Sequence, residues 1–130
     1  FTVGQKNANM LFATAVRAPL QLDNEVQNLP AASWKSIPLN LTYPGTLVVS
    51  VTVVQGNPVD VFLTDGTGIA ALQANQRVGS INGFEATKTR DYRRSGQLGR
   101  GVYYLILRDT SLGILSAHAS DISVNATLNP

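Results

Sequence analysis

Apolar and polar residues alternate with a period of two along several stretches of this chain. The clearest stretch runs from Leu47 to Val54 and has β-branched residues at most positions. This pattern predicts a central β-strand, because successive side chains of a strand point to opposite faces of the sheet. The stretch from Val59 to Thr64 alternates in the same way, and Gln55-Gly56-Asn57-Pro58 between the two is rich in turn residues. We therefore expect the two strands to form a hairpin.

Three other stretches also predict strands. Ile37 to Leu41 alternates around Pro38, which cannot donate to a ladder and so indicates an edge strand or a bulge. Val102 to Leu107 is apolar or aromatic throughout, which is typical of a strand in the middle of a sheet. Ile122 to Leu128 alternates with polar residues and predicts a strand with one solvated face. We expect Ser111-Leu112-Gly113 to supply the turn between these last two strands.

The remaining segments are different in character. Ile69 to Gln76 predicts a short helix of about two turns or an irregular crossover. Phe84 to Tyr92 has the composition of a polar strand, and Arg93 to Arg100 that of a loop. Residues 1–30 predict one strand, Met10 to Val16, followed by a turn-rich link.

These elements together indicate the fold class. A chain of 130 residues has the usual size of one domain. Several short strands with glycine-marked turns and few helices are typical of a sandwich or jelly roll. We expect an all-β protein: a single antiparallel β-sandwich of jelly-roll type over residues 1–130, with about eight strands and at most one short helix.

Four segments of residues 33–128 carry a resemblance to known domains. They are Trp34-Lys35-Ser36-Ile37-Pro38-Leu39, Pro44-Gly45-Thr46-Leu47, Gly56-Asn57-Pro58-Val59-Asp60-Val61-Phe62-Leu63 and Gly101-Val102-Tyr103-Tyr104-Leu105-Ile106-Leu107. Their pattern and spacing resemble those of GOLD-like and bacterial pre-peptidase C-terminal-like β-sandwich domains. The resemblance implies an accessory module that serves protein, sugar or lipid recognition rather than catalysis.

Composition and charge narrow the functional classes. Charged residues make up 14% of the chain, below the roughly 25% of an average soluble domain. This balance, together with a first residue that is Phe1 and not Met, leads us to expect a secreted or periplasmic protein that has lost a leader, or a piece of a longer protein. A net charge of +2 is mild for a nucleic-acid-binding protein, so we do not expect that partner. No apolar run approaches the roughly 18 residues of a membrane helix, so no membrane span is predicted.

The chain has no Cys and a single histidine, His118. Without Cys there are no disulfides, thiolate nucleophiles or thiolate metal sites. A Ser-His-Asp arrangement with this histidine could draw on nearby residues: Ser111, Ser116 or Ser120, with Asp109 or Asp121. The G-x-S-x-G elbow of many hydrolases is missing, and nearness in sequence does not create the geometry of a catalytic triad. We expect a noncatalytic protein without a cofactor, and keep a small hydrolase that uses Asp residues with His118 as the less favoured alternative.

Three loop aspartates are weak candidates for a calcium site: Asp65, Asp109 and Asp121. Calcium takes oxygen ligands, which loops supply. No D-x-D-x-D-G spacing supports such a site, and loop Asp residues more often accept hydrogen bonds from their own backbone. Asp65-Gly66-Thr67-Gly68 is likewise typical of a turn rather than of the D-T-G motif of aspartic proteases. We expect turn capping and no metal site.

The strongest polar cluster lies within residues 88–100, where only Asp91 opposes the positive charge. Its members are Lys88, Arg90, Tyr92, Arg93, Arg94 and Arg100. As a binding site it would hold an anionic partner, with Tyr92 stacking on the ligand. As a solvated loop it would keep a protein of low charge soluble. Both interpretations stay open at the level of the sequence.

Aromatic residues offer a second kind of site. Trp34, Tyr43, Phe84 and Tyr92 are candidates for a sugar-stacking platform, although core packing suits Trp34 and Phe84 better. We therefore predict a noncatalytic recognition or assembly module that binds a protein partner or an extended ligand through an edge strand and the loops of residues 65–100. The same surface would serve self-association into a homo-oligomer. A carbohydrate-binding module, with a glycan as partner, is the alternative.

Overall fold

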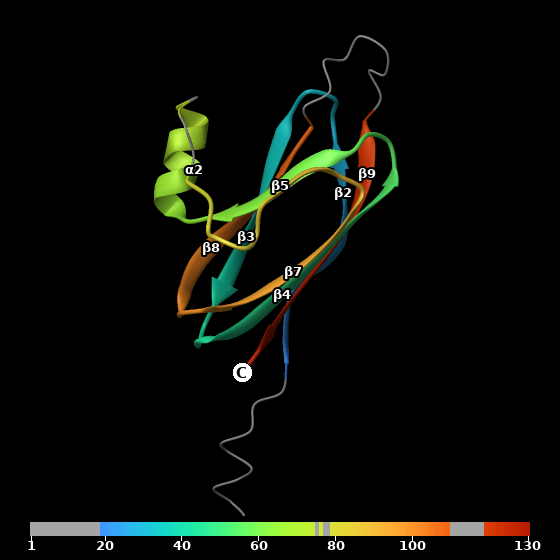
Figure 1. Ribbon diagram of the computed structural model, residues 1–130. Helices are drawn as coiled ribbons and strands as arrows, with labels where there is room; N and C mark the ends of the chain where they lie inside the picture. The colour runs from blue at the N-terminus through green and yellow to red at the C-terminus, as the bar shows by residue number, and fades with distance from the viewer. Residues whose placement is uncertain (1–18, 75, 77–78, 110–118) are drawn as a thin grey trace, which may run out of the picture.

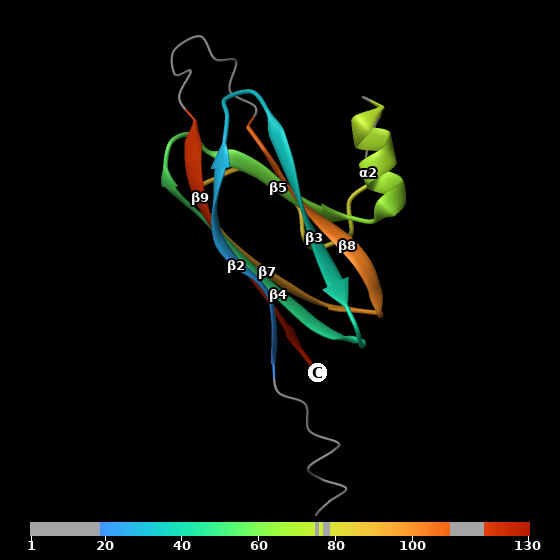
Figure 2. The same cartoon turned by 180° about the vertical axis from the view of Figure 1, so that it is seen from behind.

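The structure, a computed structural model, describes residues 19–74, 76, 79–109 and 119–130. These residues form eight strands in two antiparallel sheets, together with one short helix (Figure 1). The sheets face each other and enclose the apolar core, and the view from behind shows helix α2 (Gly66–Gln73) on the side of the second sheet (Figure 2). The expected all-β sandwich with one short helix is confirmed. Within the described residues, no helix has the length and apolar character needed to cross a bilayer.

Successive strands of the chain alternate between the two sheets, except for β5 and β6. The first sheet has the spatial order β2 (Leu20–Leu29), β9 (Ser120–Asn129), β4 (Gly45–Gln55) and β7 (Asp91–Leu98). The second sheet has the order β3 (Trp34–Leu41), β8 (Gly101–Arg108), β5 (Val59–Thr64) and β6 (Ala86–Thr89). This strand order is that of a double-sheet jelly roll.

The core consists of the inward-facing residues of both sheets. In β4 and β9 every second residue is buried, from Leu47 to Val53 and from Ile122 to Leu128. Full burial of one such side chain contributes about 1.5–3 kcal/mol to folding. The sequence prediction of a central strand over Leu47 to Val54 is confirmed, because β4 pairs with β9 on one side and β7 on the other.

Two further sequence predictions are also confirmed. Strand β3, which contains Pro38, forms an edge of the second sheet, and β8 is the one strand with which it pairs among the described residues. Strand β8 lies inside that sheet between β3 and β5, as its apolar residues on both faces predict. The predicted strand Met10 to Val16 and the predicted turn at Ser111-Leu112-Gly113 lie outside the described residues.

The hairpin expected between β4 and β5 is wrong. The two strands belong to different sheets, and Gln55-Gly56-Asn57-Pro58 carries the chain across the sandwich. Gly56 has a φ of +117°, and the N–H of Asn57 donates to the Ser120 hydroxyl at 2.8 Å, which ties this connection to the start of β9. Turn residues mark where a strand ends, but the partner of a strand depends on how the whole core packs.

Strand β5 is buried on both faces, including Asp60, Phe62 and Thr64. Helix α2 and the segment before β6 pack over its outer face, where the Thr64 hydroxyl donates to the carbonyl of Gly79 at 2.8 Å. The helix expected over Ile69 to Gln76 is confirmed in kind, but it begins three residues earlier, at Gly66.

Two segments that looked like loops are edge strands. Arg93 to Arg100 was expected to be a loop, but most of it belongs to β7, which pairs with β4 in continuous register. The turn-rich link expected before Pro30 contains the ten residues of β2, which pair with β9 around a bulge between Gln21 and Asp23. An edge strand has one neighbour and much exposed surface, so its sequence can stay polar and lacks the apolar signal of a central strand.

Candidate recognition surface at the β7 edge

Strand β7 ends the first sheet. It pairs with β4, and among the described residues no strand lies on its other side. The N–H of Val53 donates to the carbonyl of Arg90 at 2.8 Å, which marks these two as a hydrogen-bonded pair of the antiparallel ladder. Such pairs alternate along a ladder, so the backbone groups of Tyr92 and Arg94 also face β4. The backbone groups of the intervening residues face away from the sheet.

Three residues therefore present backbone N–H and C=O groups at the outer edge of β7: Arg93, Ser95 and Gln97. Asp91 faces the same way, but the Thr89 hydroxyl accepts from its N–H at 3.3 Å and donates to its carbonyl at 3.2 Å. Outside the sheet, these edge groups of β7 can bond only to water, side chains or a further strand. The edge is thus a template for strand addition.

The two arginines of β7 lie on opposite faces of the sheet at this edge. Arg93 points to the outer face of the sheet, where its Nη1 donates to the Ser50 hydroxyl at 3.2 Å. Arg94 is on the core-facing side but stays exposed at the margin, with its guanidinium carbon 5.3 Å from the centre of the Tyr92 ring. Its Nη1 donates to the outward-facing carbonyl of Arg93 at 3.0 Å. The Arg94 guanidinium therefore lies at the backbone that an added strand would meet.

The other basic residues of the cluster lie at the two ends of β7. Lys88 and Arg90 are exposed where the chain passes from β6 to β7, and Lys88 has a φ of +48°. Arg100 is exposed in the turn between β7 and β8. The structure thus spreads the positive charge of residues 88–100 along one edge strand and its connections.

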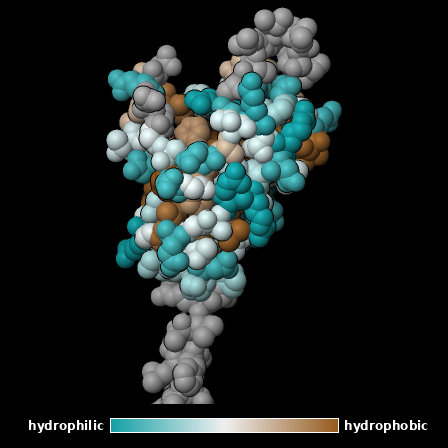
Figure 3. All heavy atoms as spheres, viewed as in Figure 1, coloured by the Kyte–Doolittle hydropathy of each residue, from teal (hydrophilic) through white to brown (hydrophobic). Residues whose placement is uncertain are grey.

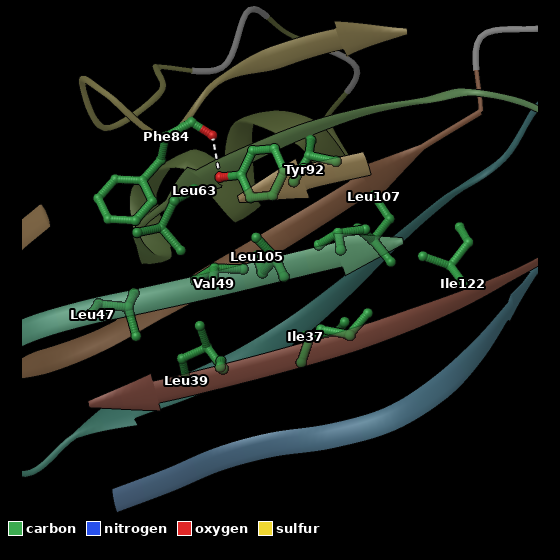
Figure 4. Close-up of a cluster of buried hydrophobic side chains, with 14 of the residues drawn as sticks. Ile37, Leu39, Leu47, Val49, Leu63, Phe84, Tyr92, Leu105, Leu107 and Ile122 are labelled. Carbon is green, nitrogen blue, oxygen red and sulfur yellow. Dashed lines mark hydrogen bonds between the residues drawn. The ribbon is translucent and has the colours of Figure 1, made fainter. Parts of the chain in front are cut away.

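Tyr92 lies in the core, apart from the other members of the cluster. Its side chain is 1% exposed, and its hydroxyl donates to the carbonyl of Phe84 at 2.6 Å (Figure 4). Burial raises the pKa of the Tyr92 hydroxyl, which therefore stays a protonated donor. The predicted stacking of Tyr92 on a ligand does not fit this position, because the ring belongs to the same buried core cluster as Leu63 and Val49.

The four aromatic residues proposed for a sugar platform do not meet on one face. Phe84 is buried with Tyr92, and Tyr43 packs against the core from the connection before β4. Trp34 is half-buried at the start of β3, an edge of the other sheet. Because the rings are distributed in this way, they do not form a shared stacking surface.

The three aspartates considered for calcium have structural partners. Asp65 caps α2, where its Oδ1 accepts from the N–H of Gly68 at 3.0 Å, as expected for a turn aspartate. Asp109 is buried and accepts from the Asn57 amide at 3.3 Å, and Asp121 accepts from the Asn28 amide at 3.1 Å. Within the described ranges, no three His, Asp or Glu side chains gather as metal ligands would. His118, Ser111 and Ser116 lie outside those ranges.

Comparisons with known proteins show which solved structures share this fold. No family model matches this sequence, and no curated protein does. Among solved structures, the pre-peptidase C-terminal domain of a collagenase from Bacillus anthracis matches with a TM-score of 0.55, covering 85% of this chain and 89% of that domain. The chain has a pre-peptidase C-terminal-like fold. At 10% identity the likeness concerns the fold alone, and the expected structural resemblance is confirmed.

This pre-peptidase C-terminal-like sandwich also has a cavity of about 330 Å³ on the outer face of its second sheet. Asp60 and Arg108 are cross-strand partners there, with Arg108 Nη2 3.5 Å from Asp60 Oδ2. The guanidinium carbon of Arg108 lies 5.4 Å from the centre of the Phe62 ring, and Phe62 is only 8% exposed, so this ring offers little surface to a sugar. On the face shown in Figure 3, hydrophobic residues are visible beside α2 among hydrophilic ones. The pair was not predicted from the sequence: an acid in an otherwise apolar strand indicates that it needs a partner, but not which residue supplies it.

The opposite edge of the first sheet is acidic. In β2, Asp23 has an Oδ2 atom that is buried and has no hydrogen-bond partner within the described residues. Burial, and secondarily Glu25, raise the pKa of Asp23 from 3.8 to about 6. Glu25 itself accepts from the Gln27 amide. Strand β2 has no Lys or Arg, so its net charge is opposite to that of β7.

We expect the stability of the protein to fall as the pH rises from about 4 to about 6, because the folded state binds the Asp23 proton more tightly than the unfolded chain does. Below that window Asp23 is protonated in both states, and above it the charged form carries its full burial cost. The Asp23→Asn variant should lose this dependence and be the more stable protein at pH 7. Thermal unfolding of both proteins at pH 4.5 and pH 7 measures the effect. An identical pH dependence in the variant would show that another group is responsible.

Proposed function

We propose that this chain is a noncatalytic recognition module that binds an extended, acidic protein segment as an added strand at the β7 edge. The observation that carries the proposal is the outward-facing backbone of Arg93, Ser95 and Gln97 beside exposed arginines. In strand addition, main-chain hydrogen bonds supply affinity and side chains supply selectivity. Here the selectivity would come from Arg93 and Arg94, which favour carboxylates in the bound segment.

The expected strength of this interaction is moderate. Each main-chain hydrogen bond contributes about 0.5–1.5 kcal/mol net, and each exposed ion pair about 0.2–1 kcal/mol. Ordering an extended ligand opposes these gains. Because the arginines are exposed, salt should weaken binding.

The proposal assigns no reaction to the chain. Asp65 caps a helix and Asp60 pairs with Arg108, so these acids already have structural roles. The low content of charged residues and the fold likeness to a domain of a collagenase support a secreted or periplasmic setting. An accessory role beside a larger partner is consistent with this setting.

Replacement of Ser95 by proline should abolish binding of an acidic strand while leaving the fold intact. Proline removes the N–H of Ser95, which faces outward, and removes no hydrogen bond to β4. Fluorescence anisotropy of a labelled peptide of alternating Glu and Thr measures binding to the full chain, with a peptide of alternating Lys and Thr as the ligand control.

The matched variant is Ser95→Ala, which keeps the N–H and changes only the side chain. It should bind the Glu-Thr peptide as the unchanged protein does. Both variants are first checked by thermal unfolding. Equal binding by Ser95→Pro and Ser95→Ala, with both folded, would count against strand addition at β7.

A further inference from the structure

The two ends of the first sheet are β7 and β2, and they differ in charge. Around β7 the exposed charges are mainly arginines, whereas β2 carries Asp23 and Glu25 and no basic residue. In β2, Val26 is also 63% exposed, which is high for an apolar side chain within a strand. Two edges of one sheet with complementary charge suggest a partner that this chain itself can supply.

The backbone directions in β2 follow from the ladder already described. In β4, the backbone N–H and C=O of Val53 point toward β7. Those of the neighbouring Thr52 therefore point toward β9, where Thr52 exchanges hydrogen bonds with its partner Ser123. The next residue of β9, Val124, therefore points its backbone N–H and C=O toward β2, and its partner Glu25 points its own backbone groups back toward β9.

The outer edge of β2 is therefore formed by the backbone of Asn24, Val26 and Asn28. One contact supports this assignment independently: Lys35 Nζ donates to the carbonyl of Asn28 at 3.0 Å, from outside the sheet. Asn24 and Val26 thus present backbone groups for pairing, as Arg93 and Ser95 do on β7.

The strand directions are compatible with joining of the β7 edge of one copy to the β2 edge of another. β2 is antiparallel to β9, β9 to β4, and β4 to β7, so β2 and β7 run in opposite directions. If a second copy is moved sideways, across the strands, and keeps the same orientation, its β2 lies antiparallel beside β7 of the first copy. The joined strands then continue the antiparallel pattern of the sheet.

The side chains match on the same face. Asp23 and Glu25 pair with Ala126 and Val124, which are buried, so the two acids are on the core-facing side of the sheet. Arg94 is on the core-facing side as well, two residues after Tyr92. With Asn24 opposite Ser95, Arg94 lies directly across from Glu25.

We infer that the acidic strand bound by the β7 edge is β2 of a second copy of this chain, so that the first sheets of successive copies join edge to edge. The inference rests on the proposed function and names its partner. Pairing covers Val26 and gives Asp23 and Glu25 the cation that the described part of a single copy does not offer them. Inward-pointing acids also disfavour β2 pairing with another β2, which leaves β7 as the matching edge.

The interface is heterologous, because each copy uses β7 on one side and β2 on the other. Every added copy leaves one edge of each kind open, so assembly continues as a series unless the rotation between copies closes a ring. Association should therefore grow with protein concentration and weaken with salt.

Sedimentation velocity of the full chain over a range of concentrations tests the inference. The Arg94→Glu and Glu25→Arg variants should each weaken association about tenfold, because each places like charges across the interface. The double variant carrying both changes should associate as the unchanged protein does. Arg100→Glu, which makes the same charge change in the turn after β7, is the control and should retain association.

Loss of association in either single variant without recovery in the double variant overturns the inference. So does a chain that stays monomeric at every concentration. If that monomer still binds the Glu-Thr peptide in a manner abolished by Ser95→Pro, the proposed function stands and the partner is a different protein. If the monomer binds no acidic peptide either, both proposals are wrong.

Discussion

Replacing Tyr92 with alanine should lower the free energy of unfolding by about 3–5 kcal/mol, which is the cost of deleting a large buried ring. Replacement with phenylalanine should lower it by about 1–3 kcal/mol, because the carbonyl of Phe84 then stays buried without its donor at 2.6 Å. Urea unfolding of the three proteins gives these differences. The result separates a core role from the ligand-stacking role that the sequence suggested.

Tyr103 provides the matched control for the hydroxyl. Its hydroxyl donates to the carbonyl of Gly99 at 2.9 Å in an exposed hydrogen bond, where water can replace the lost donor. Tyr103→Phe should therefore change stability by about 0.5 kcal/mol or less. If Tyr92→Phe is as mild as Tyr103→Phe, the hydrogen bond to Phe84 contributes little and the core assignment of the hydroxyl is wrong.

Replacing Gly56 with alanine should destabilise the protein by about 2–5 kcal/mol. The φ of +117° is one that residues with a Cβ rarely adopt. A Cβ at this position would also lie 2.6 Å from the Cα of Ser120, so the start of β9 would have to move. The connection that crosses from one sheet to the other depends on this close approach. Urea unfolding measures the loss.

Gly66 provides the contrast. It is the first residue of α2, and a Cβ there would meet no atom within 4 Å. Gly66→Ala should leave stability unchanged or raise it by up to about 1 kcal/mol, since alanine favours the helix and restricts the unfolded chain. Equal effects at the two positions would contradict the special role of Gly56.

Strands that are buried on at least one face were readable from the sequence. Leu47 to Val53 and Ile122 to Leu128 alternate because only one side of each strand can enter the core. Pro38 marked β3 as an edge for an equally local reason, since proline has no N–H to donate. These features depend on the chemistry of a few neighbouring residues.

The edge strands β2 and β7 were not readable in the same way. Arg93 and Arg94 belong to a strand because their backbone pairs with β4, and the local sequence does not predict that pairing. The basic cluster could be named from the sequence, whereas its arrangement along a sheet edge could not. The Asp60–Arg108 pair was missed for the same reason, because its two members are far apart in the chain.

Three features were predictable from the chain alone: the all-β class, the central strands and the concentration of positive charge in residues 88–100. Three others became visible in the folded protein: β4 and β5 lie in different sheets, Tyr92 enters the core, and β2 and β7 are opposite edges of one sheet. The first group follows from periodicity and composition, which are local. The second depends on which distant segments share a ladder or a core, and that choice is made by the packing of the whole chain at once.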